Sequence, residues 1–163
     1  MVILGIDPGI AIVGYGVIDY TDMKMKLIDY GAILTPAGMK IPERLDIIFD
    51  SMTEIIEQFR PDAIAFEELF FAKNVKTAIT VAQARGVAVT AAYKKNKEIY
   101  EYTPLQIKQA LTGYGRADKL QIQTMVKNLL GLSSIPKPDE AADAVAVAIT
   151  HAQSISFSND FRM

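Results

Sequence analysis

The sequence predicts an α/β domain built on a mixed five-stranded sheet, and three observations support this prediction. Three apolar segments joined by short turns fill residues 2–34, as expected of an antiparallel meander. A segment with helical spacing then leads into another short strand, which implies a crossover and parallel pairing. Half of the 163 residues are apolar and 22% are charged, a composition typical of one globular domain.

The first three strands are expected over residues 2–7, 14–19 and 26–34, with Asp22 in the turn before the third. The first is an apolar run that ends in one carboxylate, Asp7, and is stopped by a Pro-Gly turn. A charge at the end of a buried strand is costly unless it is compensated, and a cation compensates it most simply. Asp7 is therefore a candidate first ligand of a metal site.

Helices and strands alternate in the rest of the chain. We expect helices over residues 42–59, 75–95, 104–111, 119–130 and 139–154, and strands over residues 62–67 and 98–102. The helix over residues 75–95 is apolar on more than one face, which indicates that it is deeply packed or shared with a partner. Residues 1–155 are expected to form one domain and residues 156–163 a flexible tail, because the tail is polar.

Composition excludes several classes of protein. The chain has no cysteine, so it has neither a disulfide framework nor a thiolate metal site. No apolar run is long enough to span a bilayer, and the first residues lack the pattern of a signal peptide. We therefore expect a cytoplasmic protein without membrane contact. The net charge of -2 does not suggest a nucleic-acid binder, although the local distribution of charge decides that question.

Four carboxylates are candidates for one site. Asp7 and Glu67 end two strands, and if those strands are parallel neighbours both acids emerge at the same edge of the sheet. Glu140 and Asp143 are three residues apart at the start of the last helix, so they share one face. Such a cluster repels itself without a cation, and Mg²⁺ takes oxygen ligands of this kind. Two metal ions held by shared carboxylates would activate a water for phosphodiester cleavage.

Several motifs, in order, connect the chain to a known family. They are Gly5-Ile-Asp-Pro-Gly9, Gly14-Tyr-Gly16, Ala65-Phe-Glu-Glu-Leu-Phe-Phe-Ala-Lys-Asn74, Gln83-Ala-Arg-Gly-Val-Ala88 and Asp139-Glu-Ala-Ala-Asp-Ala144. With these motifs the chain resembles the RuvC family of bacterial Holliday-junction resolvases over nearly its whole length. The resemblance implies an RNase H-like fold, a homodimer, and symmetric nicking of four-way junction DNA in recombination and repair. It also implies Mg²⁺, with Mn²⁺ as a substitute and two ions per site, and RuvA and RuvB as partners.

The resemblance assigns the acids position by position. Asp7, Glu67 and Asp143 match the catalytic acids of the family. The remaining acid position is Glu140, where relatives usually have Asp or His, and Asp139 is the alternative candidate.

The resemblance also assigns contacts with DNA. Phe70 matches a loop aromatic that stacks on a base near the junction centre. Lys108 and Lys119 match basic residues suited to hold the scissile phosphate or to stabilise developing charge there. Lys73 and Arg116 are further phosphate candidates.

Contacts elsewhere are less strongly implied. Residues 10–12 are apolar where relatives often carry small polar or basic residues, which leaves DNA contacts by this loop open. The dimer interface is expected at Val81, Arg85 and Val89, with Arg85 also a candidate phosphate contact.

Simpler structural interpretations of several of these residues remain open. Asp7 alone could cap a turn. Asp139 at the start of a helix and His151 near a helix end could each interact favourably with a helix dipole. Among other functions, an actin-like ATPase would need a second domain for which this chain is too short. Two further functions remain open: an RNase H-like enzyme that acts on RNA, and a protein that binds junctions without cleaving them. The four filled acid positions argue against the last.

Overall fold

The computed structural model describes residues 1–69, 75–95, 98–155 and 160–163, so the predicted sites Phe70 and Lys73 lie outside the described residues. The strands are β1 (Val2–Asp7), β2 (Ile12–Thr21), β3 (Lys24–Leu34), β4 (Ala63–Glu67) and β5 (Ile99–Tyr102). The helices are α1 (Ile41–Phe59), α2 (Val75–Lys95), α3 (Pro104–Thr112), α4 (Lys119–Leu129) and α5 (Asp139–Ser154). Within these ranges, no helix is long and apolar enough to cross a membrane.

The five strands form one mixed sheet in the order β3-β2-β1-β4-β5, which confirms the predicted fold class. β1 pairs antiparallel with β2 and parallel with β4, and β4 pairs parallel with β5. β2 and β3 extend further than predicted, since their pairing runs from Ile12 with Leu34 to Thr21 with Lys24, across a register shift between Val17 and Ile18. Asp22 and Met23 form that turn with positive φ angles of 51° and 61°.

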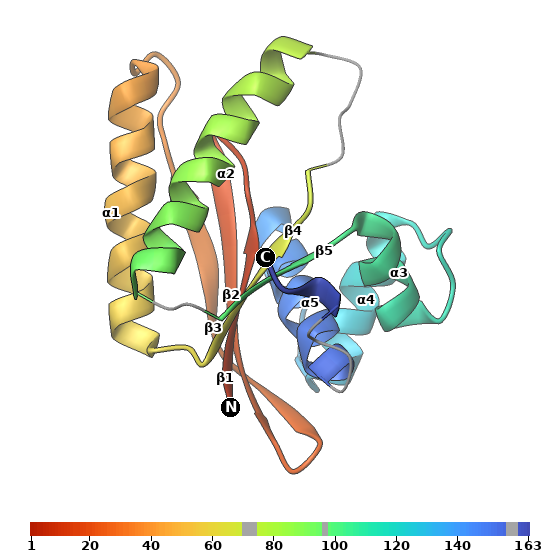
Figure 1. The fold of residues 1–163 in the computed structure, drawn as a ribbon. Helices are drawn as coiled ribbons and strands as arrows, with labels where there is room; N and C mark the ends of the chain where they lie inside the picture. The colour runs from red at the N-terminus through yellow and green to blue at the C-terminus, as the bar shows by residue number, and fades with distance from the viewer. Residues whose placement is uncertain (70–74, 96–97, 156–159) are drawn as a thin grey trace.

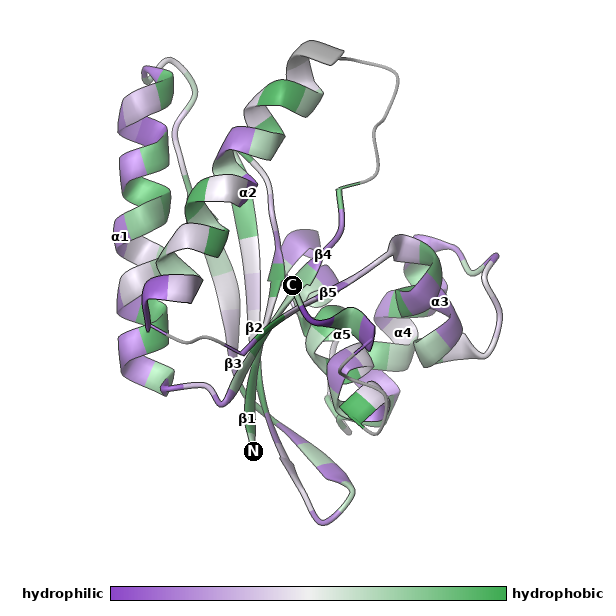
Figure 2. Ribbon diagram, in the orientation of Figure 1, coloured by the Kyte–Doolittle hydropathy of each residue, from purple (hydrophilic) through white to green (hydrophobic). Residues whose placement is uncertain are grey.

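Helices cover both faces of the sheet. α1 and α2 lie on one face, and α3, α4 and α5 lie on the other (Figure 1). Side chains of β1 point alternately to the two faces of the sheet. Ile3 packs with residues of α5, whereas Leu4 and Ile6 pack with residues of α1 and α2. Hydrophobic residues follow the central strands in Figure 2, while hydrophilic residues band the outer side of α1.

Three glycines let α5 approach the sheet closely. Gly5 of β1 and Gly16 of β2 are paired neighbours, and Gly14 of β2 pairs with Asp7. A Cβ at Gly5 would lie 2.1 Å from the carbonyl oxygen of Ala144, and one at Gly14 would lie 2.0 Å from that of Glu140. A side chain at either position would therefore push the backbone of α5 away from the ends of the strands.

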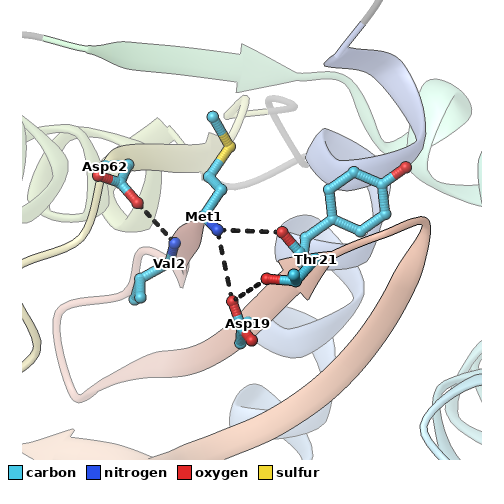
Figure 3. Close-up of polar contacts among 6 residues, drawn as sticks. Met1, Val2, Asp19, Thr21 and Asp62 are labelled. Carbon is cyan, nitrogen blue, oxygen red and sulfur yellow. Dashed lines mark hydrogen bonds and ion pairs between the residues drawn. The ribbon is translucent and has the colours of Figure 1, made fainter.

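The register between β1 and β4 is fixed at the start of β1. The Val2 amide donates a hydrogen bond of 2.7 Å to Asp62 Oδ2, and the Asp62 amide donates one of 2.8 Å to the Val2 carbonyl oxygen. On the other side, the Met1 nitrogen lies 3.4 Å from Asp19 Oδ1, which also accepts from the Thr21 hydroxyl (Figure 3). The contacts between Val2 and Asp62 therefore determine which residues lie side by side at the ends of β1 and β4.

The last four residues lie against β5. Arg162 forms a bridge with Tyr100, and the Met163 amide donates a 2.9 Å hydrogen bond to the Ile99 carbonyl oxygen. The Phe161 ring packs on Tyr102 with ring centroids 4.9 Å apart. Aromatic packing and backbone pairing thus place residues 160–163 on the edge of the sheet, while the flexible tail predicted over residues 156–163 lies partly outside the described residues and stays a prediction.

His151 belongs to the core. It is 1% exposed, and its Nδ1 lies 2.8 Å from the Tyr102 hydroxyl. Burial lowers the pKa of His151 to about 4, so the ring is neutral near neutral pH. A neutral His151 ring does not make the charge–dipole contact that was expected at this helix end.

Candidate active site

Two of the predicted acids end neighbouring parallel strands. Ile6 of β1 pairs with Phe66 of β4, so Asp7 and Glu67 come next in the two strands. Strand alternation directs both side chains to the face of the sheet that α5 covers. Glu68 is exposed, as expected from the same alternation.

The other two acids come from the start of α5. Asp143 is half-buried, with 24% of its side chain exposed, and Glu140 lies one turn before it. The close contact of the Glu140 backbone with Gly14 holds this end of α5 over β2, opposite Asp7. The structure therefore brings all four predicted carboxylates to one edge of the sheet.

The carboxylates perturb one another strongly. Burial, together with the charges of Glu67 and Asp143, raises the pKa of Asp7 to about 8. Burial and the charge of Asp143 raise the pKa of Glu67 as well. Burial also raises the pKa of Asp143, against the opposing effect of the Lys119 ammonium. Glu140 adds to the negative charge around Asp7 and Asp143.

Among the described residues, Lys119 is the cation that forms an ion pair with one of these four carboxylates. It is the first residue of α4. The Asp118 side chain caps the start of this helix by accepting a hydrogen bond of 2.8 Å from the backbone N–H of Gln121. Lys119 Nζ lies 2.9 Å from Asp143 Oδ2 and 3.8 Å from Asp139 Oδ2. The hydrogen bond to Asp143 raises the pKa of Lys119, so the ammonium stays charged.

A pocket of about 210 Å³ opens beside the acids, between α3, α4 and α5. It is lined by Glu67, Pro104, Ile107, Lys108, Ala117, Asp118, Lys119, Ile122, Asp143 and Ala146. Lys108 and Lys119 thus face the same hollow as Glu67 and Asp143, and Lys108 acts to lower the pKa of Glu67. Arg116 is exposed in the loop between α3 and α4, outside this lining.

The chemistry of the site fits a hard divalent cation. The donors are carboxylate oxygens, and burial together with their mutual repulsion raises their pKa values, so a cation would stabilise the ionised forms. In the described part of the chain, no three acidic or histidine side chains already form a group that could hold a metal ion. Cation binding would therefore require the carboxylates to draw together and Lys119 to leave Asp143.

The predicted interface residues lie on α2. Val81, Arg85 and Val89 are half-buried, and Arg85 Nη2 makes a 2.6 Å ion pair with Glu101 of β5. The inner side of the helix is closed by Ala84, Ala88, Ala91 and Ala92, which are buried with residues of α1 and the sheet. Ile79 and Tyr93 on the outer side are 56% and 60% exposed.

Sequence reasoning missed the residues that support the site. Gly5, Gly14 and Gly16 control the approach of α5, and their placement on one face of adjacent strands is a signal that spacing could have revealed. Ile107 and Ala117, which form apolar walls of the pocket, carry no signal beyond ordinary core patterning.

Comparison with known proteins gives a consistent result. The family model for crossover junction endodeoxyribonuclease RuvC matches residues 3–151. A crossover junction endodeoxyribonuclease RuvC from Alkaliphilus oremlandii is 58% identical over 163 residues, covering 100% of this chain and 99% of that protein. The one from Clostridioides difficile is 59% identical over 154 residues, covering 94% of this chain and 91% of that protein.

Solved structures agree. Thermus thermophilus RuvC in complex with a Holliday junction substrate superposes with a TM-score of 0.90 at 34% identity, covering 100% of both chains. The yeast mitochondrial Holliday junction resolvase gives a TM-score of 0.69 at 16% identity, covering 97% of this chain and 82% of that one. The second likeness shows a shared fold.

Proposed function

The chain belongs to the RuvC family of crossover junction endodeoxyribonucleases, and on this premise we propose that it is a nuclease that resolves four-way DNA junctions. The observation that carries the proposal is the meeting of Asp7, Glu67 and Asp143 beside a pocket that also holds Lys119. Anionic oxygens that repel one another, placed next to lysines at an open hollow, suit the hydrolysis of a phosphodiester.

We assign the metal-binding role to Asp7, Glu67, Glu140 and Asp143. Mg²⁺ or Mn²⁺, two ions when DNA is bound, would supply a reactive water at neutral pH and would stabilise the leaving oxygen. Glu140 takes the variable acid position in this proposal because its charge acts on Asp7, whereas Asp139 forms an ion pair with Lys137.

The lysines act on the DNA. Lys108 and Lys119 line the pocket, and we assign to both the holding of the scissile phosphate and to Lys119 the stabilisation of negative charge that develops there. We assign weaker phosphate contacts to the exposed Arg116, and, from the sequence, to Lys73. From the sequence we also assign to Phe70 the stacking on a base at the junction centre.

Paired symmetric nicks follow if two copies bind one junction. We propose a homodimer through α2, whose inner side packs on its own subunit and whose outer side exposes Ile79 and Tyr93. A two-fold axis then gives two equivalent sites, one for each of two opposed strands. Action in the cytoplasm, with RuvA and RuvB as partners, belongs to the same proposal.

A cleavage assay tests this function. The protein is incubated with a synthetic four-way junction, a linear duplex and an RNA–DNA hybrid, each with Mg²⁺ and with EDTA. We expect nicks in the junction alone, in Mg²⁺ alone, at symmetric positions on two opposed strands. Preferential cutting of the hybrid would favour an RNA-acting enzyme. Binding of the junction without cutting in Mg²⁺ or Mn²⁺ would contradict the proposed activity.

A further inference from the structure

The position of Lys119 conflicts with the proposed role of Asp143. Lys119 Nζ donates to Asp143 Oδ2 at 2.9 Å. If Asp143 binds a divalent cation, the ammonium and the metal ion compete for one carboxylate and repel each other. Lys119 must therefore leave Asp143 when the cation binds, and another anion is needed to keep it beside the pocket.

Asp139 is placed to take over Lys119. The carboxylates of α5 that act electrostatically on Lys119 are those of Asp143, Asp139 and Glu140. Asp143 and Glu140 are assigned to the metal, which leaves Asp139, whose Oδ2 already lies 3.8 Å from Lys119 Nζ. The lysine side chain is long and 54% exposed, so it can move over this short distance.

Neighbouring side chains hold the Asp139 carboxylate in place. Lys137 Nζ donates to Asp139 Oδ1 at 2.6 Å, which lowers the pKa of Asp139 and keeps it charged. The side chain of Gln123 lies near Asp139. Gln123 is 4% exposed, and its buried Nε2 has no hydrogen-bond partner among the described residues, so this donor remains available to Asp139.

We propose that Asp139 is a positioning residue: when a divalent cation binds at Asp143, the Lys119 ammonium transfers from Asp143 to Asp139 and stays at the pocket. This inference rests on the proposed function, because it takes Asp143 as a metal ligand. It gives the two adjacent acids at the start of α5 different tasks. Glu140 faces the metal, and Asp139 holds the lysine that contacts the phosphate.

A double-mutant cycle on metal affinity separates this role from direct coordination. Mn²⁺ binding is measured without DNA, from the loss of the electron paramagnetic resonance signal of the free ion. The chains compared are the parent, Asp139→Asn, Lys119→Met and the double variant. Asp50→Asn is the charge-matched control, because Asp50 is exposed on α1, on the opposite face of the sheet.

Asp139→Asn is expected to weaken Mn²⁺ binding about fivefold in the parent, because Lys119 then stays on Asp143 and competes with the ion. In the Lys119→Met background the competitor is absent, so the same change is expected to weaken binding less than about twofold. Asp50→Asn is expected to change nothing in either background.

Two results would overturn the inference while leaving the function intact. Equal weakening in both backgrounds would make Asp139 a metal ligand itself, and unchanged affinity in both would deny it any role toward Lys119. If the parent neither binds Mn²⁺ nor cuts junctions, the proposed function fails and this inference fails with it.

Discussion

Replacing Asp7 with asparagine is expected to abolish junction cleavage while leaving junction binding intact. Asp7 lies at the centre of the carboxylate cluster, with Glu67, Asp143 and Glu140 all acting on it. Loss of a shared metal ligand removes several kcal/mol of transition-state stabilisation, so the cleavage rate is expected to fall by about 10³-fold or more. Binding depends on phosphate contacts, which a lost negative charge does not weaken.

The measurement is single-turnover cleavage of a labelled junction, alongside a gel-shift titration in Ca²⁺. The thermal unfolding midpoint serves as the folding control, and it is not expected to fall, because the substitution removes a carboxyl group whose ionised form burial disfavours. Glu68→Gln is the matched control, since Glu68 is the exposed neighbour of Glu67. Full cleavage by Asp7→Asn would show that the metal-binding role is wrongly assigned.

Replacing Gly5 with alanine is expected to cause a large loss of stability although it adds only one methyl group. The new Cβ would lie 2.1 Å from the Ala144 carbonyl oxygen and 2.7 Å from the Ala148 nitrogen, both in the backbone of α5. A backbone cannot rotate aside as a side chain can, so α5 must shift. We expect the free energy of unfolding to fall by about 2–4 kcal/mol.

Cleavage by Gly5→Ala should fall too, because Asp143 precedes Ala144 and moves with it. A displacement near 1 Å costs roughly 100-fold in rate. Gly38→Ala is the control: Gly38 has a φ of +91° and open space around it, so alanine there should cost about 1 kcal/mol without affecting cleavage. Equal stability losses in the two variants, measured by urea unfolding, would contradict the close packing of α5.

Much of the sheet could be predicted from sequence because its signals are local. The apolar run that ends at Asp7 predicted the bounds of β1, and the shift to helical spacing after the third strand predicted the crossover to β4. Parallel pairing then placed Asp7 and Glu67 at one edge. Their roles as metal ligands stay predictions, although the raised pKa values support them.

What the sequence did not reveal depends on contacts between distant segments. Asp139 and Glu140 are adjacent acids, and only the positions of Lys119 and Lys137 distinguish Asp139 as the paired one. The docking of Phe161 on Tyr102 was also missed, because a short and mostly polar segment shows no hydrophobic periodicity. His151 was missed for a related reason, since its partner Tyr102 is contributed by β5.

The most direct test of the account is to locate the metal. A crystal of the protein soaked in Mn²⁺ and measured near the manganese absorption edge gives an anomalous difference map. We expect a peak in contact with the carboxylates of Asp7 and Asp143, with Glu67 or Glu140 completing the set, and the Lys119 ammonium withdrawn from Asp143. A map with no peak at this edge of the sheet, or with its peak at other residues, would contradict the proposed metal-dependent active site.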